Sequence, residues 1–141
     1  MCPTRKEEHE TQKLHGKRIL VMEDYPRMGE ILSETLNDYC HASHVLTGRD
    51  ALAQIEWKAP DVILLDLNLP DMNGLEVVRV VRQDEKTSRI LVLAMSGNYM
   101  NYKKCFEVGC KDFIHKPFTL PALLARLSGL IHLSSINVVT L

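Results

Sequence analysis

Five polar side chains follow apolar runs in the sequence, each at or directly after the end of a run. They are Glu23 and Asp24 after RILVM, Asp66 at the end of VILLD, Ser96 after ILVLAM and Lys116 after DFIH. If these runs are parallel strands of one sheet, their carboxyl ends lie at the same edge, where such sheets bind ligands. The sequence therefore predicts one cleft that contains three carboxylates, a hydroxyl and an ammonium group.

This set of groups favours binding of a metal ion and an anion. Three neighbouring carboxylates raise one another's pKa, and a bound divalent cation relieves the repulsion. Oxygen ligands suit Mg²⁺, which keeps several of its waters. With Lys116 as a second positive charge, a phosphoryl group fits at Asp66, because its transfer depends mainly on positioning and charge neutralisation. An aspartate can act as the nucleophile and form an acyl phosphate.

Taken singly, each of these groups has an ordinary structural explanation. A strand-end aspartate is commonly a turn residue, and Ser96 could cap a helix. The loop after Asp66 is expected to supply backbone groups to the site, with Gly74 permitting its turn. The prediction depends on the combination, since all of the groups follow alternating strands in this order.

Five apolar runs alternate with segments of helical periodicity. Strands are expected at 18–22, 42–46, 62–66, 90–95 and 112–115, and helices around 28–39, 51–55, 75–81, 102–109 and 120–131. Short apolar runs suit strands that are covered on both faces. The alternation predicts an α/β fold, a doubly wound five-stranded parallel sheet with helices on both sides.

The bulk composition is that of one ordinary globular domain. The 141 residues are 45% hydrophobic and 25% charged, with a formal net charge of -1, which argues against a basic nucleic-acid surface. No apolar run is long enough to cross a membrane, and we expect a cytoplasmic protein without a secretory signal. We expect a flexible N-terminal arm at 1–16, a domain at 17–132, and a C-terminal tail or linker start at 133–141.

Cysteines and histidines give no metal signature. None of Cys2, Cys40, Cys105 and Cys110 forms a C-x-x-C pair, which indicates buried or incidental thiols. His41 and His44 share an expected strand, but no cysteine or acidic ligand lies nearby at zinc-like spacing. We therefore expect both histidines on the surface.

Four stretches resemble the receiver (CheY-like) domain of two-component response regulators over about residues 17–132. They are ILVMED from Ile19, PDVILLDLNLPDMNGLEV from Pro60, ILVLAMSG from Ile90 and GCKDFIHKPF from Gly109. The resemblance implies a flavodoxin-like (βα)5 fold with strand order 2-1-3-4-5. It also implies a response regulator receiver that accepts a phosphoryl group on Asp66, from a histidine kinase or histidine phosphotransfer protein, in a Mg²⁺-dependent reaction.

The resemblance further implies roles for individual residues. Asp24 and Asp66 ligate Mg²⁺, Glu23 acts mostly through water, and the backbone carbonyl of Asn68 is a further ligand. Ser96 and Lys116 bind phosphoryl oxygens, and small Gly97 keeps access to Asp66 open. Phe113 corresponds to the switch aromatic, which turns inward as Ser96 moves. The Lys116-Pro117 peptide bond is expected to be cis.

The resemblance implies a signalling switch that catalyses its own phosphorylation and dephosphorylation, rather than an enzyme with a separate substrate. The surface that changes on phosphorylation and is recognised by partners would be the face of the fourth helix, the fifth strand and the last helix. The alternative interpretation of this face is an ordinary solvated surface. Candidate residues there are Tyr99, Tyr102, Lys103, Lys104, Lys111 and Arg126. An unknown target protein would bind this face, or a second copy of the chain would bind it in a phosphorylation-dependent homodimer. We expect no direct contact of the protein with nucleic acid or membrane.

Other interpretations stay open at this point. The chain could be a stand-alone receiver or a receiver cut from a longer regulator, and it could pass the phosphoryl group on to another histidine. An Asp-nucleophile phosphatase of the haloacid dehalogenase type needs a second Asp where this chain has Asn68, and its acidic pair follows the nucleophile instead of preceding it. A pseudo-receiver that is never phosphorylated disagrees with the complete set of acidic, serine and lysine residues.

Overall fold

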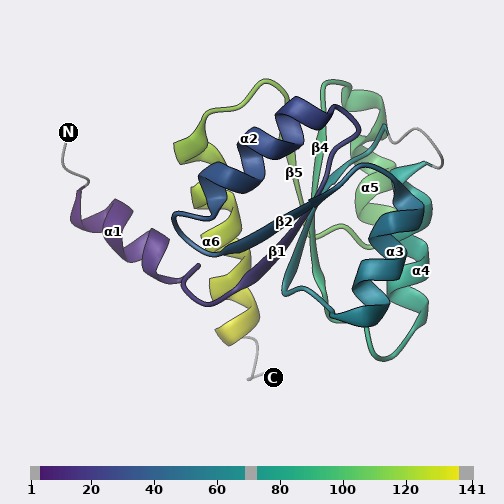
Figure 1. Ribbon diagram of the computed structural model, residues 1–141, viewed down its shortest axis with the longest axis horizontal. Helices are drawn as coiled ribbons and strands as arrows, with labels where there is room; N and C mark the ends of the chain where they lie inside the picture. Colours follow the sequence, from purple (N-terminus) through teal and green to yellow (C-terminus); the bar gives the residue numbers. More distant parts are fainter. Residues whose placement is uncertain (1–3, 69–72, 137–141) are drawn as a thin grey trace.

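The computed structural model describes residues 4–68 and 73–136, and within them the chain forms a five-stranded parallel sheet in the order β2-β1-β3-β4-β5 (Figure 1). The strands are β1 (Arg18–Met22), β2 (His41–Val45), β3 (Val62–Asp66), β4 (Leu91–Ser96) and β5 (Asp112–His115). All four neighbouring pairs are parallel. The doubly wound α/β fold and the strand order 2-1-3-4-5 are confirmed.

Helices cover both faces of the sheet. They are α1 (Arg5–Gln12), α2 (Pro26–Leu36), α3 (Gly48–Trp57), α4 (Gly74–Gln83), α5 (Tyr102–Val108) and α6 (Leu120–Ile136), with a short 3-10 helix η1 (Tyr99–Asn101) before α5. Helices α2 and α6 lie on one side of the sheet, and α3, α4 and α5 lie on the other (Figure 1).

The alternation of side chains along the strands creates two cores, one on each face. Successive strand residues point to opposite faces. Ile63 and Leu65 of β3 belong to the cluster under α3, α4 and α5, whereas Val62 and Leu64 belong to the cluster under α2 and α6. Every residue of β3 is buried, while the edge strand β2 is partly exposed. The central strands therefore form a rigid base for their carboxyl ends.

The residues that start the next helices help to fix these strand ends. Pro26 starts α2 at a position where a backbone N–H is not needed. Asn73 caps α4, since its Oδ1 accepts a hydrogen bond from the N–H of Leu75. Gly74 has no positive φ; a Cβ there would lie 2.9 Å from the carbonyl oxygen of Asp66. Glycine is thus required for close approach to the strand end, not for an unusual turn conformation.

The N-terminal segment needs a correction to the expected arm at 1–16. Residues Arg5–Gln12 form helix α1, which contacts α6, and Leu14 is fully buried. Polar residues 5–12 carry no apolar stripe, so the sequence does not indicate that this segment packs against α6. At the other end, α6 continues to Ile136, and the remainder of the expected tail, 137–141, lies outside the described residues.

We expect Leu14→Ala to destabilise the domain by about 2–4 kcal/mol, because a buried leucine loses its contacts and leaves a cavity. Leu14 belongs to the same buried cluster as Leu130 and Ile131 of α6. Urea unfolding measures the change. The matched control is Leu133→Ala, since Leu133 lies on α6 and is exposed. Equal midpoints for the two variants would contradict the predicted contribution of Leu14 to stability.

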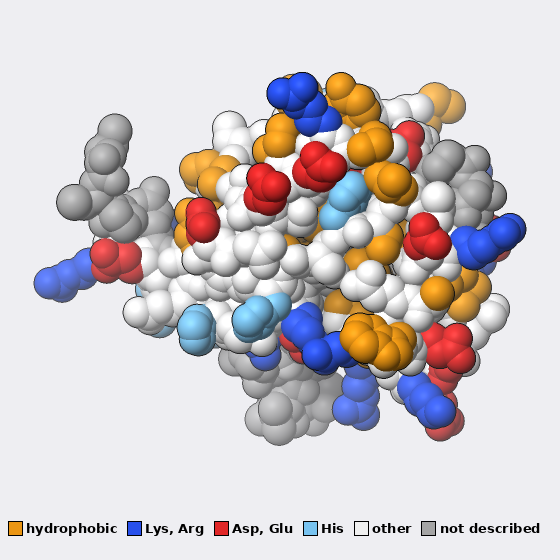
Figure 2. Space-filling model, in the orientation of Figure 1, with side chains coloured by type: hydrophobic (Ala, Val, Ile, Leu, Met, Phe, Trp, Pro, Cys, Tyr) orange, Lys and Arg blue, Asp and Glu red, His pale blue; other side chains and the backbone are white. Residues whose placement is uncertain are grey.

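The surface carries charges of both signs on the face shown in Figure 2, in agreement with the net charge of -1. Among the helices of the described residues, none has the length and apolar character needed to cross a bilayer. Cys40, Cys105 and Cys110 are buried free thiols, as expected, and Cys2 lies outside the described residues. The Lys116-Pro117 peptide bond is cis.

Candidate functional site

Three buried polar residues mark the carboxyl edge of the sheet. Within the described part of the chain, the buried polar side chains are those of Glu23, Asp66, Ser96 and Ser128, and the first three directly end or follow strands β1, β3 and β4. A buried carboxylate is unfavourable unless it is paired and hydrogen-bonded. The contacts of these carboxylates therefore define the site.

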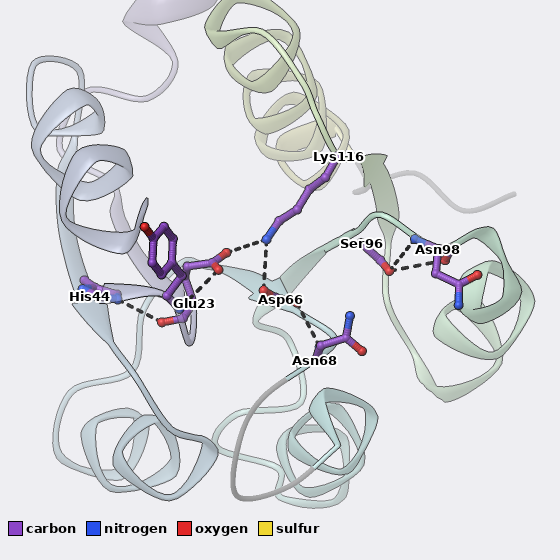
Figure 3. Close-up of polar contacts among 8 residues, drawn as sticks. Glu23, His44, Asp66, Asn68, Ser96, Asn98 and Lys116 are labelled. Atoms are coloured by element: carbon purple, nitrogen blue, oxygen red, sulfur yellow. Dashed lines mark hydrogen bonds and ion pairs between the residues drawn. The ribbon is translucent and has the colours of Figure 1, made fainter. Parts of the chain in front are cut away.

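Lys116 supplies the positive charge for both buried carboxylates. Its Nζ lies 2.7 Å from Oε2 of Glu23 and 3.0 Å from Oδ2 of Asp66 (Figure 3). The residue follows β5, and its backbone N–H donates to the carbonyl of Ser96 at 2.9 Å. The end of β5 is thereby fixed beside the end of β4, so the lysine side chain reaches across to β3 and β1.

Burial and charge act in opposite directions on these groups. Burial alone would lower the pKa of Lys116, but its hydrogen bonds and ion pairs with Glu23 and Asp66 outweigh this effect and raise it. Burial raises the pKa of Glu23, and the nearby charge of Asp66 adds to this, although Lys116 opposes both. The ammonium is therefore held in its charged form between the carboxylates.

The second oxygen of Asp66 is oriented by the loop that follows it. Oδ1 accepts a hydrogen bond of 2.9 Å from the backbone N–H of Asn68 (Figure 3). With Oδ2 bound to Lys116, both oxygens have a partner and the carboxylate has one defined orientation. A carboxylate held in this way can act as a nucleophile without a preceding reorientation.

The acidic residues form a donor set that fits a hard cation. Glu23, Asp24 and Asp66 each offer a carboxylate oxygen, and these oxygens lie within 4.8 Å of one another. Asp24 is exposed, so the cluster is open to solvent on one side. All of the donors are oxygens, and one ammonium does not neutralise three carboxylates. The residues therefore fit Mg²⁺ by charge and by ligand type.

Ser96 lies at the same edge, but its hydroxyl is bound within its own loop. Its Oγ accepts from the N–H of Asn98 at 3.0 Å and donates to the carbonyl of Asn98 at 3.3 Å (Figure 3). Phe113 is buried in this structure, and its ring centroid lies 5.4 Å from that of Tyr102 in an edge-to-face arrangement. The structure thus brings Glu23, Asp66 and Lys116 into direct contact, and it leaves Ser96 committed to backbone groups.

His44 is a site residue that the sequence did not reveal. It is partly buried rather than on the surface, and its Nε2 lies 3.1 Å from the carbonyl oxygen of Glu23. Gly29 of α2 leaves room for this ring, because a Cβ there would lie 1.8 Å from Nε2. The sequence pattern of β2 does not indicate that a histidine on this edge strand reaches the end of the neighbouring strand β1. His41 is exposed, as expected.

The residues expected on the face that partners would recognise are all exposed. Arg126 differs from the lysines of this set in that its Nη1 lies 2.8 Å from Oδ1 of Asp112, which forms an ion pair at the surface between α6 and β5.

Comparisons with known proteins match most of this chain. A family model described as "Response regulator receiver domain" matches residues 19–128. The transcriptional regulatory protein TrcR of Mycobacterium tuberculosis is 33% identical over 119 residues, which cover 84% of this chain and 46% of TrcR. The chain spans half or less of the length of the first curated relatives that it matches.

Two solved structures share the fold. The chemotaxis protein CheY4 of Vibrio cholerae is 27% identical with a TM-score of 0.77, over 82% of this chain and 99% of CheY4. The receiver domain of the sensor histidine kinase PA1611 of Pseudomonas aeruginosa, which has a magnesium ion coordinated in its active site cleft, is 28% identical with a TM-score of 0.75. That match covers 84% of this chain and 99% of the receiver domain.

Proposed function

The chain belongs to the response regulator receiver domain family, and from this premise we propose that Asp66 accepts a phosphoryl group in a Mg²⁺-dependent reaction. The observation that carries the proposal is the Lys116 ammonium, which contacts both Glu23 and Asp66 beside an open acidic cluster. We assign the receiver to residues 17–132, against which α1 and Leu14 pack. The phosphoryl donor is a histidine kinase or a histidine phosphotransfer protein, and the protein acts in the cytoplasm.

In the proposed reaction, a carboxylate oxygen of Asp66 attacks the phosphorus atom. The bond from phosphorus to the donor nitrogen breaks, and the imidazole leaving group takes up a proton. Lys116 already lies 3.0 Å from Asp66 Oδ2, so its ammonium can pair with a phosphoryl oxygen after a short movement. Glu23, Asp24, Asp66 and the backbone carbonyl of Asn68 would hold Mg²⁺, which neutralises charge on the phosphoryl oxygens.

The new charge at Asp66 is proposed to switch the protein between two conformations. Ser96 Oγ donates to the Asn98 carbonyl in this structure, and it would instead donate to a phosphoryl oxygen. The phosphorylated form would therefore favour a different arrangement of the loop after β4, with Phe113 following as the switch aromatic. The surface of α5, β5 and α6 would present the change to a target protein or to a second copy.

A relay role is the second candidate. The likeness to the receiver domain of a sensor histidine kinase, PA1611, favours it. In a relay, the acyl phosphate on Asp66 would be attacked by a histidine nitrogen of a phosphotransfer protein. Transfer of label from the phosphorylated chain to such a protein would distinguish a relay from a terminal switch.

Acetyl phosphate with Mg²⁺ should add one phosphoryl group to the protein, because the small donor needs only the acidic site and Lys116. Intact-mass measurement with Mg²⁺ and with EDTA tests this. We expect a single adduct with Mg²⁺ and loss of most of it with EDTA, since the carboxylates then repel the incoming anion. An adduct that formed equally in EDTA would contradict the proposed metal dependence.

A further inference from the structure

His115 on β5 contacts the loop that controls Ser96. Ser96 and His115 lie opposite each other in the register of β4 and β5. The His115 Nε2 is 3.2 Å from the carbonyl oxygen of Gly97, the residue after Ser96. Because a carbonyl oxygen can only accept, Nε2 carries the proton and donates it. The imidazole thus binds the first residue of the loop.

The same imidazole also holds the loop through a side chain. The ring of Tyr99 stacks on that of His115 with centroids 4.2 Å apart and an interplanar angle of 6°. The Tyr99 ring also lies 6.2 Å from that of Phe113. Residues 97–100 are exposed. The side chains of β5 therefore attach this loop to the folded core, in addition to the hydroxyl of Ser96 at the end of β4. We refer to His115, Gly97 and Tyr99 as the His115 clamp.

The position of the clamp matters because Asn98 lies inside it. Asn98 is between Gly97 and Tyr99, and its backbone N–H and C=O bind the hydroxyl of Ser96. Asn98 Oδ1 also accepts from the N–H of Met100, which fixes the start of η1. Fixing both neighbours of Asn98 on β5 therefore preserves the conformation in which the Ser96 proton is directed at a backbone carbonyl.

We propose that the His115 clamp holds Ser96 in its unphosphorylated position and so sets how readily the site accepts a phosphoryl group. This inference rests on the proposed function and deepens it by naming His115 as a positioning residue for the switch. A Ser96 hydroxyl that donates to a phosphoryl oxygen no longer donates to the Asn98 carbonyl, so the loop loses this contact in the phosphorylated state. Contacts that exist only in the unphosphorylated state reduce affinity for the phosphoryl group.

The test compares binding of beryllofluoride, a phosphoryl analogue, by wild type and His115→Ala in the presence of Mg²⁺. Loss of one hydrogen bond and one ring stack should tighten binding by about tenfold. His115→Phe keeps the ring stack without the donor and should give a smaller gain. Met100→Ala is the matched control, because Met100 lies in the same loop and is 83% exposed. Fluorine NMR titration measures the affinities.

The direction of the effect separates a clamp from a merely structural role. Damage to the fold weakens binding, whereas release of the clamp strengthens it. Affinity of His115→Ala equal to or below that of wild type would overturn the proposal.

Amide hydrogen exchange tests the clamp in the protein without Mg²⁺ or analogue, independently of phosphoryl chemistry. We expect faster exchange at Asn98 and Met100 in His115→Ala, because both amides are hydrogen-bonded inside the loop. Unchanged exchange there would overturn the clamp. A wild-type protein that bound no beryllofluoride would contradict the proposed function, and the exchange result would still decide whether His115 fixes the loop.

Discussion

Asp66→Asn should abolish the phosphoryl adduct formed from acetyl phosphate while leaving the domain folded. The amide is a poor nucleophile and cannot form an acyl phosphate. The change nearly preserves size, and the amide oxygen can still accept from the N–H of Asn68, as Oδ1 of the carboxylate does. Lys116 keeps Glu23 as a charged partner at 2.7 Å. The variant therefore removes the reactive group with little loss of local structure.

Intact-mass spectrometry measures the adduct in both proteins, and circular dichroism confirms that the variant is folded. The matched control is Asp38→Asn, since Asp38 is an exposed aspartate two residues after the end of α2. We expect wild-type labelling from that control. Hydroxylamine should remove the wild-type adduct, because acyl phosphates react with it and phosphoserine does not. Labelling of Asp66→Asn at the wild-type level would place the phosphoryl group on another residue.

The central strands were predictable because burial on both faces leaves an apolar run. β1 and β3 have the expected bounds, and β4 begins and ends one residue later than expected, at Leu91–Ser96. The edge strand β2 is shifted by one residue to His41–Val45, whereas the other edge strand, β5, has the expected bounds. The half-polar composition of β2 defines its ends poorly.

The clustering of Glu23, Asp24, Asp66 and Lys116 was predictable because parallel strands place their carboxyl ends together. The directions of their side chains were not. Ser96 could point to Asp66 or to Asn98, and only the loop conformation decides between them. The contact of Lys116 with Glu23 joins β5 to β1 across the sheet. The two residues are far apart in the sequence, so no local sequence pattern predicts that their side chains touch. Leu14 is a single apolar residue in a polar segment, so its burial depends wholly on tertiary packing.

Lys116→Met should change two measured properties in opposite directions. The methionine keeps much of the length of the side chain but removes its charge. Glu23 and Asp66 then lose the cation that lies 2.7 and 3.0 Å away, and the cluster becomes more negative. We expect affinity for Mg²⁺ to rise on the order of tenfold, because one competing positive charge has left the site. Isothermal titration calorimetry measures this affinity.

Phosphorylation of the same variant should become slower, by roughly a hundredfold with acetyl phosphate, because a charged donor no longer stabilises the transferring phosphoryl group. Tighter metal binding does not replace the charged hydrogen-bond donor that the Lys116 ammonium supplies. Lys111→Met is the matched control: Lys111 is exposed and precedes β5, and we expect both of its values to equal those of wild type. If Lys116→Met lost Mg²⁺ affinity and phosphorylation together, the lysine would be maintaining the fold of the cleft, and its proposed part in phosphoryl binding would fail.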